Sequence, residues 1–280
     1  MIISVASGKG GTGKTTVAAN LSAVLNNATY IDCDVEEPNG AILLKPEITV
    51  SKSVYKKIPK IEPFSCIYCG KCKEVCEFNS IIFILGEVLI IDEMCHSCGA
   101  CSYFCSAGAI KEIVKEIGKI NIGNAGDTKF VEGVLNIGEV SASPLIRELL
   151  KTENDDSLKI IDSPPGTSCS MVEAVKESDY CILVTESTPF GLHDLKLAIK
   201  VVNNLGIKFG VIINKYDPMF KELDDYLSSE NIEILTKIPF DKKYAELYSA
   251  GNLLIKDSVI KEKMLCVYNK IESKLKNENK

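Results

Sequence analysis

Tryptophan is missing from this chain of 280 residues, and arginine and histidine are nearly so. Arg147 is the one arginine among 32 basic residues, so a site that needs a cation must draw almost always on lysine. The net charge of −6 argues against a general nucleic-acid binder, which would carry a basic surplus. The hydrophobic fraction of 46% is ordinary for a globular protein, so we expect a full buried core.

Long hydrophobic runs are also missing. The longest, residues 81–91, is broken by Gly86 and Glu87 and is too short to span a bilayer. No cationic leader precedes the first strand pattern, so we expect no secretory signal. Twelve cysteines without such a signal indicate metal or redox chemistry in a reducing cytoplasm, not a disulfide framework.

Apolar strand patterns alternate with helical patterns along most of the chain, which indicates a parallel sheet covered by helices on both faces. Helical spacing near the C-terminus, at Met264, Val267 and Ile271, suits a membrane-surface helix, but packing against the sheet is the preferred interpretation. The expected strands are 2–7, 29–34, 158–162, 180–186, 209–214 and 232–238, and the expected helices are 14–26, 190–205, 218–228 and 241–250.

A glycine-rich loop at residues 8–15 follows the first strand pattern and opens a helix pattern, as a phosphate-binding P-loop must. Its backbone N–H groups can close around phosphate oxygens, Lys14 adds a positive charge, and the Thr15 hydroxyl can ligate Mg²⁺. The nucleotide-binding residues predicted here are Gly8, Lys9, Gly10, Gly11, Thr12, Gly13, Lys14, Thr15 and Thr16.

The form Lys9-Gly-Gly-Thr-Gly-Lys14-Thr resembles the deviant Walker A loop of the MinD/ParA/nitrogenase-iron-protein superfamily. The resemblance implies a nucleotide-dependent homodimer in which Lys9 crosses to the partner's nucleotide. A transferred phosphoryl group needs a cation, often a trans arginine, and this chain has only Arg147. Lys9 is therefore the better candidate, with an ordinary exposed loop lysine as the alternative.

The same resemblance assigns two aspartates. Asp34, in Ile-Asp32-Cys-Asp34, matches the switch I aspartate that orients the attacking water, with Asp32 as a supporting group. Asp162, before Ser-Pro-Pro-Gly166, matches the switch II aspartate that meets Mg²⁺ through water. Asp34 as a turn or helix-cap residue is the alternative.

The segment Asn214-Lys-Tyr-Asp217, at the end of a strand pattern, bears on which nucleotide base is bound. Many GTPases read guanine with such an Asn-Lys-x-Asp pattern, whereas members of the resembled superfamily place an asparagine here to hold adenine. We favour ATP, with Asn214 on the adenine.

Eight cysteines form two copies of one pattern, Cys-x2-Cys-x2-Cys-x3-Cys, which is typical of bacterial two-cluster ferredoxins. In that pattern the fourth cysteine reaches the other cluster, so the assignment is crossed. Cys66, Cys69, Cys72 and Cys105 are predicted to hold one [4Fe–4S] cluster, and Cys95, Cys98, Cys101 and Cys76 the second. Structural zinc is the main alternative, although zinc ligands usually come in pairs from two turns. Proline is missing after the fourth cysteine of each copy, where Glu77 and Ser106 stand.

As a whole the chain resembles MinD-superfamily ATPases with an inserted ferredoxin domain. The expected fold is an α/β P-loop NTPase with a mostly parallel central sheet, residues 1–57 and 115–280, interrupted by a small α+β ferredoxin-like domain, residues 58–114. Cys169 matches a cysteine that holds a subunit-bridging cluster in the nitrogenase iron protein, but a small buried residue is the preferred interpretation here.

These features predict a cytoplasmic ATPase, a homodimer, in which ATP and Mg²⁺ gate electron transfer through two [4Fe–4S] clusters to an unidentified redox partner or metallocofactor. A positioning or scaffold ATPase with structural or redox-sensing clusters is one alternative. A factor that assembles iron–sulfur clusters or metallocofactors is the other.

Overall fold

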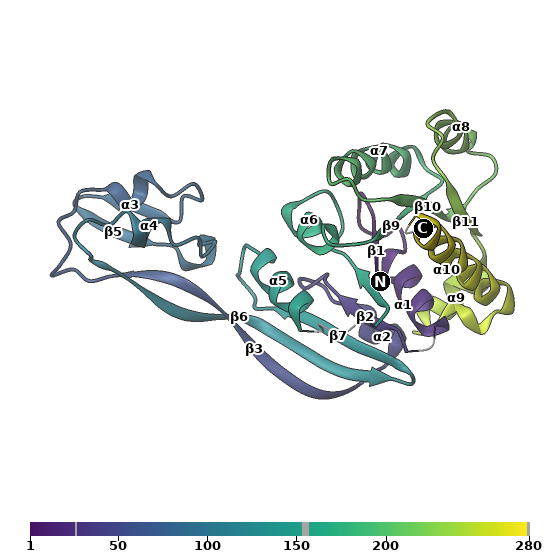
Figure 1. Ribbon diagram of the computed structural model, residues 1–280, viewed down its shortest axis with the longest axis horizontal. Coiled ribbons are helices and arrows are strands. Elements are labelled where there is room, and N and C mark those ends of the chain that lie inside the picture. Colours follow the sequence, from purple (N-terminus) through teal and green to yellow (C-terminus); the bar gives the residue numbers. More distant parts are fainter. Residues whose placement is uncertain (26, 153–156, 279–280) are drawn as a thin grey trace.

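A twisted sheet of nine strands forms the centre of the main body (Figure 1). The structure is a computed structural model that describes residues 1–25, 27–152 and 157–278. The first seven strands in sheet order are parallel, whereas β6 and β3 are antiparallel to their neighbours. From edge to edge the strands are β11 (Ile234–Pro239), β10 (Phe209–Tyr216), β9 (Tyr180–Glu186), β1 (Ile2–Ala6), β8 (Lys159–Asp162), β2 (Thr29–Asp32), β7 (Thr128–Leu135), β6 (Ile110–Ala125) and β3 (Glu47–Ile61). The predicted mostly parallel α/β architecture is confirmed.

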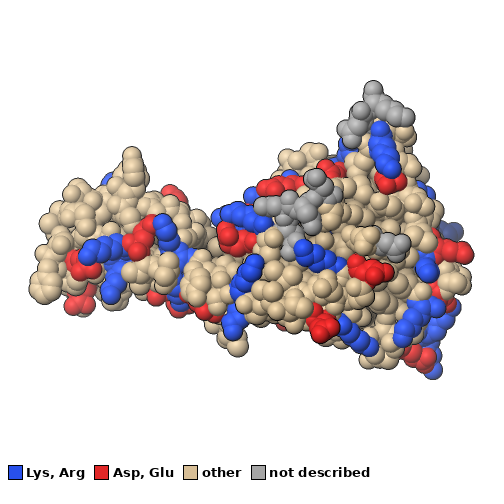
Figure 2. Space-filling view, turned by 60° about the horizontal axis from the view of Figure 1, so that its bottom comes forward, with Lys and Arg blue, Asp and Glu red and all other residues tan. Residues whose placement is uncertain are grey.

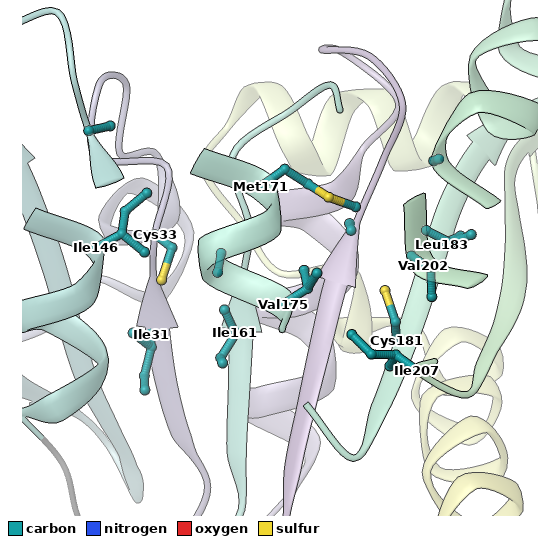
Figure 3. Packing of buried hydrophobic residues seen from close by; sticks show 14 of the residues in the cluster. Ile31, Cys33, Ile146, Ile161, Met171, Val175, Cys181, Leu183, Val202 and Ile207 are labelled. Carbon is teal, nitrogen blue, oxygen red and sulfur yellow. The ribbon is translucent and has the colours of Figure 1, made fainter. Parts of the chain in front are cut away.

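Helices cover both faces of the sheet and divide the core in two. One apolar cluster joins the sheet to α5, α6, α7 and α8, with Ile146, Met171 and Val202 buried in it (Figure 3). The other lies under α1, α2, α9 and α10. The helices are α1 (Lys14–Val24), α2 (Gly40–Leu44), α5 (Ser143–Lys151), α6 (Cys169–Val175), α7 (Pro189–Asn204), α8 (Lys221–Ser229), α9 (Lys242–Ser249) and α10 (Ser258–Glu278).

The C-terminal helix α10 packs into the core, as preferred from its sequence. Met264, Val267 and Ile271 are buried in the same cluster as residues of α1. Burying a side chain of this kind stabilises the fold by about 1.5–3 kcal/mol. In the part of the chain that the structure describes, no helix is both long enough and apolar enough to cross a membrane.

Strands β3 and β6 are much longer than the others and pair with each other along their whole length, from Glu47 with Asn124 to Ile61 with Ile110. The two strands leave the main body as a ribbon and carry residues 62–109 at the far end (Figure 1). Figure 2 shows this small unit as a lobe that stands clear of the main body. The domain limits expected at residues 58 and 114 fall within this ribbon.

The small unit is built from two similar halves. It contains the hairpin β4 (Ile81–Ile84) and β5 (Glu87–Ile90), the one-turn helices α3 (Lys71–Glu74) and α4 (Ala100–Tyr103), and a 3₁₀ turn, η1 (Asp92–Met94). Gly70 and Gly99 precede the two helices with the same left-handed backbone, φ 73° and ψ −1°. The duplication inferred from the cysteine spacing is therefore present in the backbone.

Candidate functional site

The glycine loop lies between β1 and α1, at the carboxyl ends of the parallel strands. Gly13 precedes α1 with φ 91°, in the left-handed region that favours glycine. A Cβ at Gly13 would collide with the Asn214 side chain, and one at Gly8 with the backbone of Asp194. Gly10 and Gly11 face open space instead. The loop is thus packed at both ends and open in the middle, where a phosphate would contact its N–H groups.

This loop borders a hollow of about 480 Å³, a normal size for a small-molecule pocket. The structure brings almost all predicted nucleotide-site residues to it; Gly8 and Asp162 are the two that do not line it. The lining includes Lys9, Gly10, Gly11, Thr12, Gly13, Lys14, Thr15, Thr16, Asp34 and Asn214. Thr15 and Asp34 are thus on the phosphate side, and Asn214 comes from the end of β10.

Lys14 and Asp162 form a buried ion pair beneath the loop. The Lys14 ammonium lies 2.8 Å from Asp162 Oδ1 and 3.7 Å from Asp34 Oδ2. Burial by itself lowers the pKa of Lys14, but these carboxylates outweigh it and the pKa is raised, so the lysine stays charged. The second oxygen of Asp162 accepts a hydrogen bond of 2.9 Å from the Tyr30 hydroxyl.

Asp32 holds the segment that carries Asp34. Its two oxygens accept hydrogen bonds from the backbone N–H groups of Asp34, at 3.1 Å, and of Gly40, at 2.9 Å. Asp32 is fully buried, and burial together with the Asp162 charge raises its pKa well above the usual range. Burial likewise raises the pKa of Asp34 to about 6, although Lys14 opposes the shift. Asp34 therefore titrates close to neutral pH.

We predict that ATP hydrolysis depends on pH through Asp34. Only the carboxylate can orient a water molecule by accepting its proton, so kcat/KM should be level above about pH 7 and fall about tenfold per unit well below pH 6. Asp34→Asn, assayed with the same nucleotide, is the control. Its residual kcat/KM should show only the pH dependence that comes from the nucleotide and should lack the fall due to Asp34. A wild-type profile that is flat from about pH 5 to 8 would contradict the role.

Lys9 is held within its own chain by Glu186 at the end of β9. Its ammonium lies 2.6 Å from Glu186 Oε1, and the ammonium of Lys215 lies 3.0 Å from Glu186 Oε2. Lys215 also donates to the carbonyl of Gly11 at 2.9 Å. Burial raises the pKa of Glu186, but the two lysines outweigh this and the pKa is lowered. Lys9 thus lies at the rim of the hollow, partly exposed and tethered.

The hollow is also lined by residues that the sequence did not single out. Pro239, Phe240 and Tyr248 lie there with Asn214, and the amide of Asn214 donates to the carbonyl of Thr12 at 2.8 Å. Asp217 is not among the lining residues and instead accepts a hydrogen bond from the Met219 N–H at 2.9 Å. Asn214 thus lies in the lining together with apolar and aromatic residues, and its amide N–H is engaged by Thr12.

The eight patterned cysteines line two small hollows in the lobe, four around each. One hollow is lined by Cys66, Cys69, Cys72 and Cys105, and the other by Cys95, Cys98, Cys101 and Cys76. Each set therefore takes three cysteines from one copy of the pattern and the last from the other copy. His96, inside the second loop, is exposed and stacks on Phe78 at 3.8 Å between ring centroids.

The two thiol loops are built alike. Tyr68 and Ser97 occupy equivalent positions with φ 54° and 59°, and each donates its N–H to the sulfur two residues earlier at 3.4 Å. Within the described ranges no three Cys, His, Asp or Glu side chains are placed to hold a single metal ion. The thiols surround a space rather than converge on one point.

Cys169 was expected to be buried, and this expectation is wrong. It is exposed at the first position of α6, whereas Met171, Ala174 and Val175 face the core. Residues two apart on a helix point about 200° apart, so a helix that buries Met171 turns Cys169 outward.

The chain is similar to known proteins along most of its length. A family model described as the CobQ/CobB/MinD/ParA nucleotide binding domain matches residues 3–255. The uncharacterized protein MJ0579 of Methanocaldococcus jannaschii is 33% identical over an alignment of 263 positions, which covers 91% of this chain and 92% of that protein. An iron-sulfur cluster carrier protein of Pyrococcus abyssi is 26% identical over 301 residues, covering 98% of this chain and 86% of the carrier.

Among solved structures, the septum site-determining protein MinD of Pyrococcus horikoshii, in complex with Mg-ADP, superposes with a TM-score of 0.61. The alignment covers 96% of this chain and 95% of that one at 19% identity, so this likeness concerns the fold.

Proposed function

This chain belongs to the CobQ/CobB/MinD/ParA family of nucleotide-binding proteins, and from that premise we propose that it is a homodimeric ATPase whose nucleotide state gates electron transfer through two [4Fe–4S] clusters. The recipient would be a partner protein or a metallocofactor. The observation that carries the proposal is that one chain lines a hollow at its glycine loop and two four-thiol hollows, and that a continuous ribbon joins the two regions.

The phosphates of ATP would bind the open middle of the glycine loop, with Lys14 beside them. Thr15 and, through water, Asp162 would hold Mg²⁺, which neutralises phosphate charge. Asp162 now pairs with Lys14, so we expect Lys14 to turn toward the phosphates when ATP binds and to free Asp162 Oδ1. Asp34, 3.7 Å from Lys14 at the same hollow, would orient the attacking water.

ATP is the favoured nucleotide because of how Asn214 and Asp217 lie. The Asn214 N–H is already donated to Thr12, which leaves its carbonyl oxygen to accept from the amino group of adenine. Reading guanine through the Asn-Lys-x-Asp pattern would require Asp217 at the base, but Asp217 does not line the hollow. Phe240 and Tyr248 can instead pack on the adenine ring.

The eight thiols fit two clusters better than two zinc ions. Four sulfurs on one tetrahedral Zn²⁺ would lie about 3.8 Å apart, and convergent ligand groups of this kind are not found in the described part of the chain. The two hollows, each ringed by four thiols, suit a [4Fe–4S] cluster, which accepts and donates single electrons. The N–H groups of Tyr68 and Ser97 would stabilise the thiolates.

A role in cluster assembly is the second candidate, and the iron-sulfur cluster carrier relative of Pyrococcus abyssi is the observation that favours it. This role requires iron to leave the protein during turnover. Electron transfer requires iron to remain bound. Iron content before and after ATP hydrolysis, with an acceptor protein present, separates the two.

Nucleotide binding to anaerobically purified protein tests the nucleotide half. We expect ATP to bind more tightly than GTP, and Lys14→Ala to weaken ATP binding at least about 30-fold, as loss of one partner of a buried charge pair does. Lys71→Ala, which removes an exposed lysine paired with Glu74, is the matched control and should bind normally. Equal affinity for GTP, or unchanged affinity in Lys14→Ala, would overturn this assignment.

A further inference from the structure

The two cysteine loops are equivalent in sequence pattern but not in how they are attached. The second hollow is lined by Lys57, Pro59 and Glu112, which lie on the ribbon closer to the main body than Ile61 and Ile110, which line the first. The second cysteine loop therefore lies nearer the nucleotide domain.

A group of charged side chains, two of them buried, lies where the ribbon meets the main body. Lys56 on β3 and Lys115 on β6 stand directly opposite each other, a placement that is repulsive by itself. Glu139, from the segment between β7 and α5, resolves it: one oxygen lies 2.6 Å from the Lys56 ammonium and the other 3.2 Å from that of Lys115. The Lys56 and Glu139 side chains are only 2% and 3% exposed.

The same lysines also hold the start of the second cysteine loop. Lys115 lies 2.7 Å from a carboxylate oxygen of Glu93, and Lys56 donates to the Glu93 carbonyl at 3.4 Å. Two residues later comes Cys95, the one buried cysteine of the eight. Ser97 adds a further tie, since its hydroxyl accepts the Lys57 N–H at 3.0 Å.

The first cysteine loop has no such attachment at the matching positions. Phe64 stands where Glu93 does and Tyr68 where Ser97 does, and both aromatic side chains are exposed. The network is thus a property of the second loop, not of the duplicated pattern.

Glu139 is joined to the nucleotide hollow through packed helices. Its segment leads into α5, which packs on α6 in one apolar cluster with Ile146, Met171 and Val175 (Figure 3). Arg147 of α5 also pairs with Glu173 of α6 at 3.2 Å. Before α6 lies Pro165, which lines the hollow. A movement at Pro165 can therefore reach Glu139 through contiguous, packed segments.

We propose that Glu139 is a positioning residue that couples the nucleotide site to the second cysteine loop and not to the first. This rests on the proposed function, since it takes nucleotide binding at the glycine loop as given. Packed interiors rearrange between discrete states, so a shift of α5 would change how Lys56 and Lys115 hold residues 92–101.

Hydrogen–deuterium exchange of the anaerobic full chain, with and without a nonhydrolysable ATP analogue, tests the coupling. In the wild type, the analogue should slow exchange in residues 8–16 and change exchange in residues 92–101 by about fivefold or more, the low end of measured couplings, with residues 63–72 unaltered. Glu139→Gln should keep the response in 8–16 and lose it in 92–101. Glu74→Gln, an exposed carboxylate of the first half, should respond like the wild type.

A second variant provides the test if Glu139→Gln does not fold. Lys56→Met with Glu139→Met removes the buried pair together, which proteins often tolerate, and should also lose the response in 92–101. The inference is overturned if either folded variant keeps the response, or if residues 92–101 of the wild type do not respond while 8–16 do. Absence of any response in 8–16 would instead overturn the nucleotide site itself and the inference with it.

Discussion

Lys9→Ala should leave ATP binding nearly unchanged while ATP hydrolysis falls about 10³- to 10⁵-fold, the effect of removing a cation supplied in trans. Binding survives because the loop N–H groups and Lys14 remain at the hollow. We expect hydrolysis to fail because the Lys9 ammonium, which lies at the partly exposed rim and is paired with Glu186, would be the group that crosses to a partner subunit. The transferred phosphoryl group would then lose its second cation.

Lys215→Ala is the matched control for that experiment. Like Lys9→Ala, this change removes one of the two lysines that pair with Glu186. Lys215, however, also donates to the Gly11 carbonyl of its own chain. We expect hydrolysis within about tenfold of the wild type, the change that about 1.4 kcal/mol produces. Equal losses in the two variants, or normal turnover in Lys9→Ala, would refute a role for Lys9 across the dimer.

Replacing Cys76 with alanine should destroy the second cluster, although Cys76 belongs to the first copy of the pattern. The reason is the crossed lining of the two hollows, in which Cys76 lies with Cys95, Cys98 and Cys101. Iron should fall from about eight to about four atoms per chain. Cys76→Ala and Cys98→Ala should leave the same electron paramagnetic resonance signal, and Cys72→Ala the other one.

Cys266→Ala controls for the loss of a cysteine as such, because Cys266 is exposed on α10, far along the chain from both sets. It should keep all of the iron. If Cys76→Ala and Cys72→Ala left the same signal, the crossed assignment would be wrong.

The parallel sheet could be predicted because each of its central strands is an apolar run with its own turn signals. The strands expected at 180–186 and 209–214, for example, became β9 and β10 with nearly the same limits. The P-loop could be predicted because its glycines and Lys14 all lie within residues 8–14. The crossed thiol sets required only the spacing of the cysteines.

The ribbon could not be predicted because β3 lacks the signal of a buried strand. All residues from Glu47 to Ser53 are exposed, and the partner strand of β3 follows only after the whole cysteine segment. The ion pairs of Glu139 and Glu186 could not be predicted either, because each joins residues that are far apart in the chain. The sequence places Tyr30 within a strand but does not show that its hydroxyl reaches Asp162, a contact that exists because β2 and β8 are adjacent.

The reduction potentials of the anaerobic protein, measured without nucleotide, with ADP and with a nonhydrolysable ATP analogue, test most directly whether nucleotide state gates the clusters. A nucleotide can shift a redox equilibrium only if it binds the two states differently. We expect at least one cluster potential to differ between the ATP and ADP states by about 59 mV, a tenfold change for one electron. Identical potentials in all three states, together with equal rates of electron transfer to a soluble acceptor, would contradict the account.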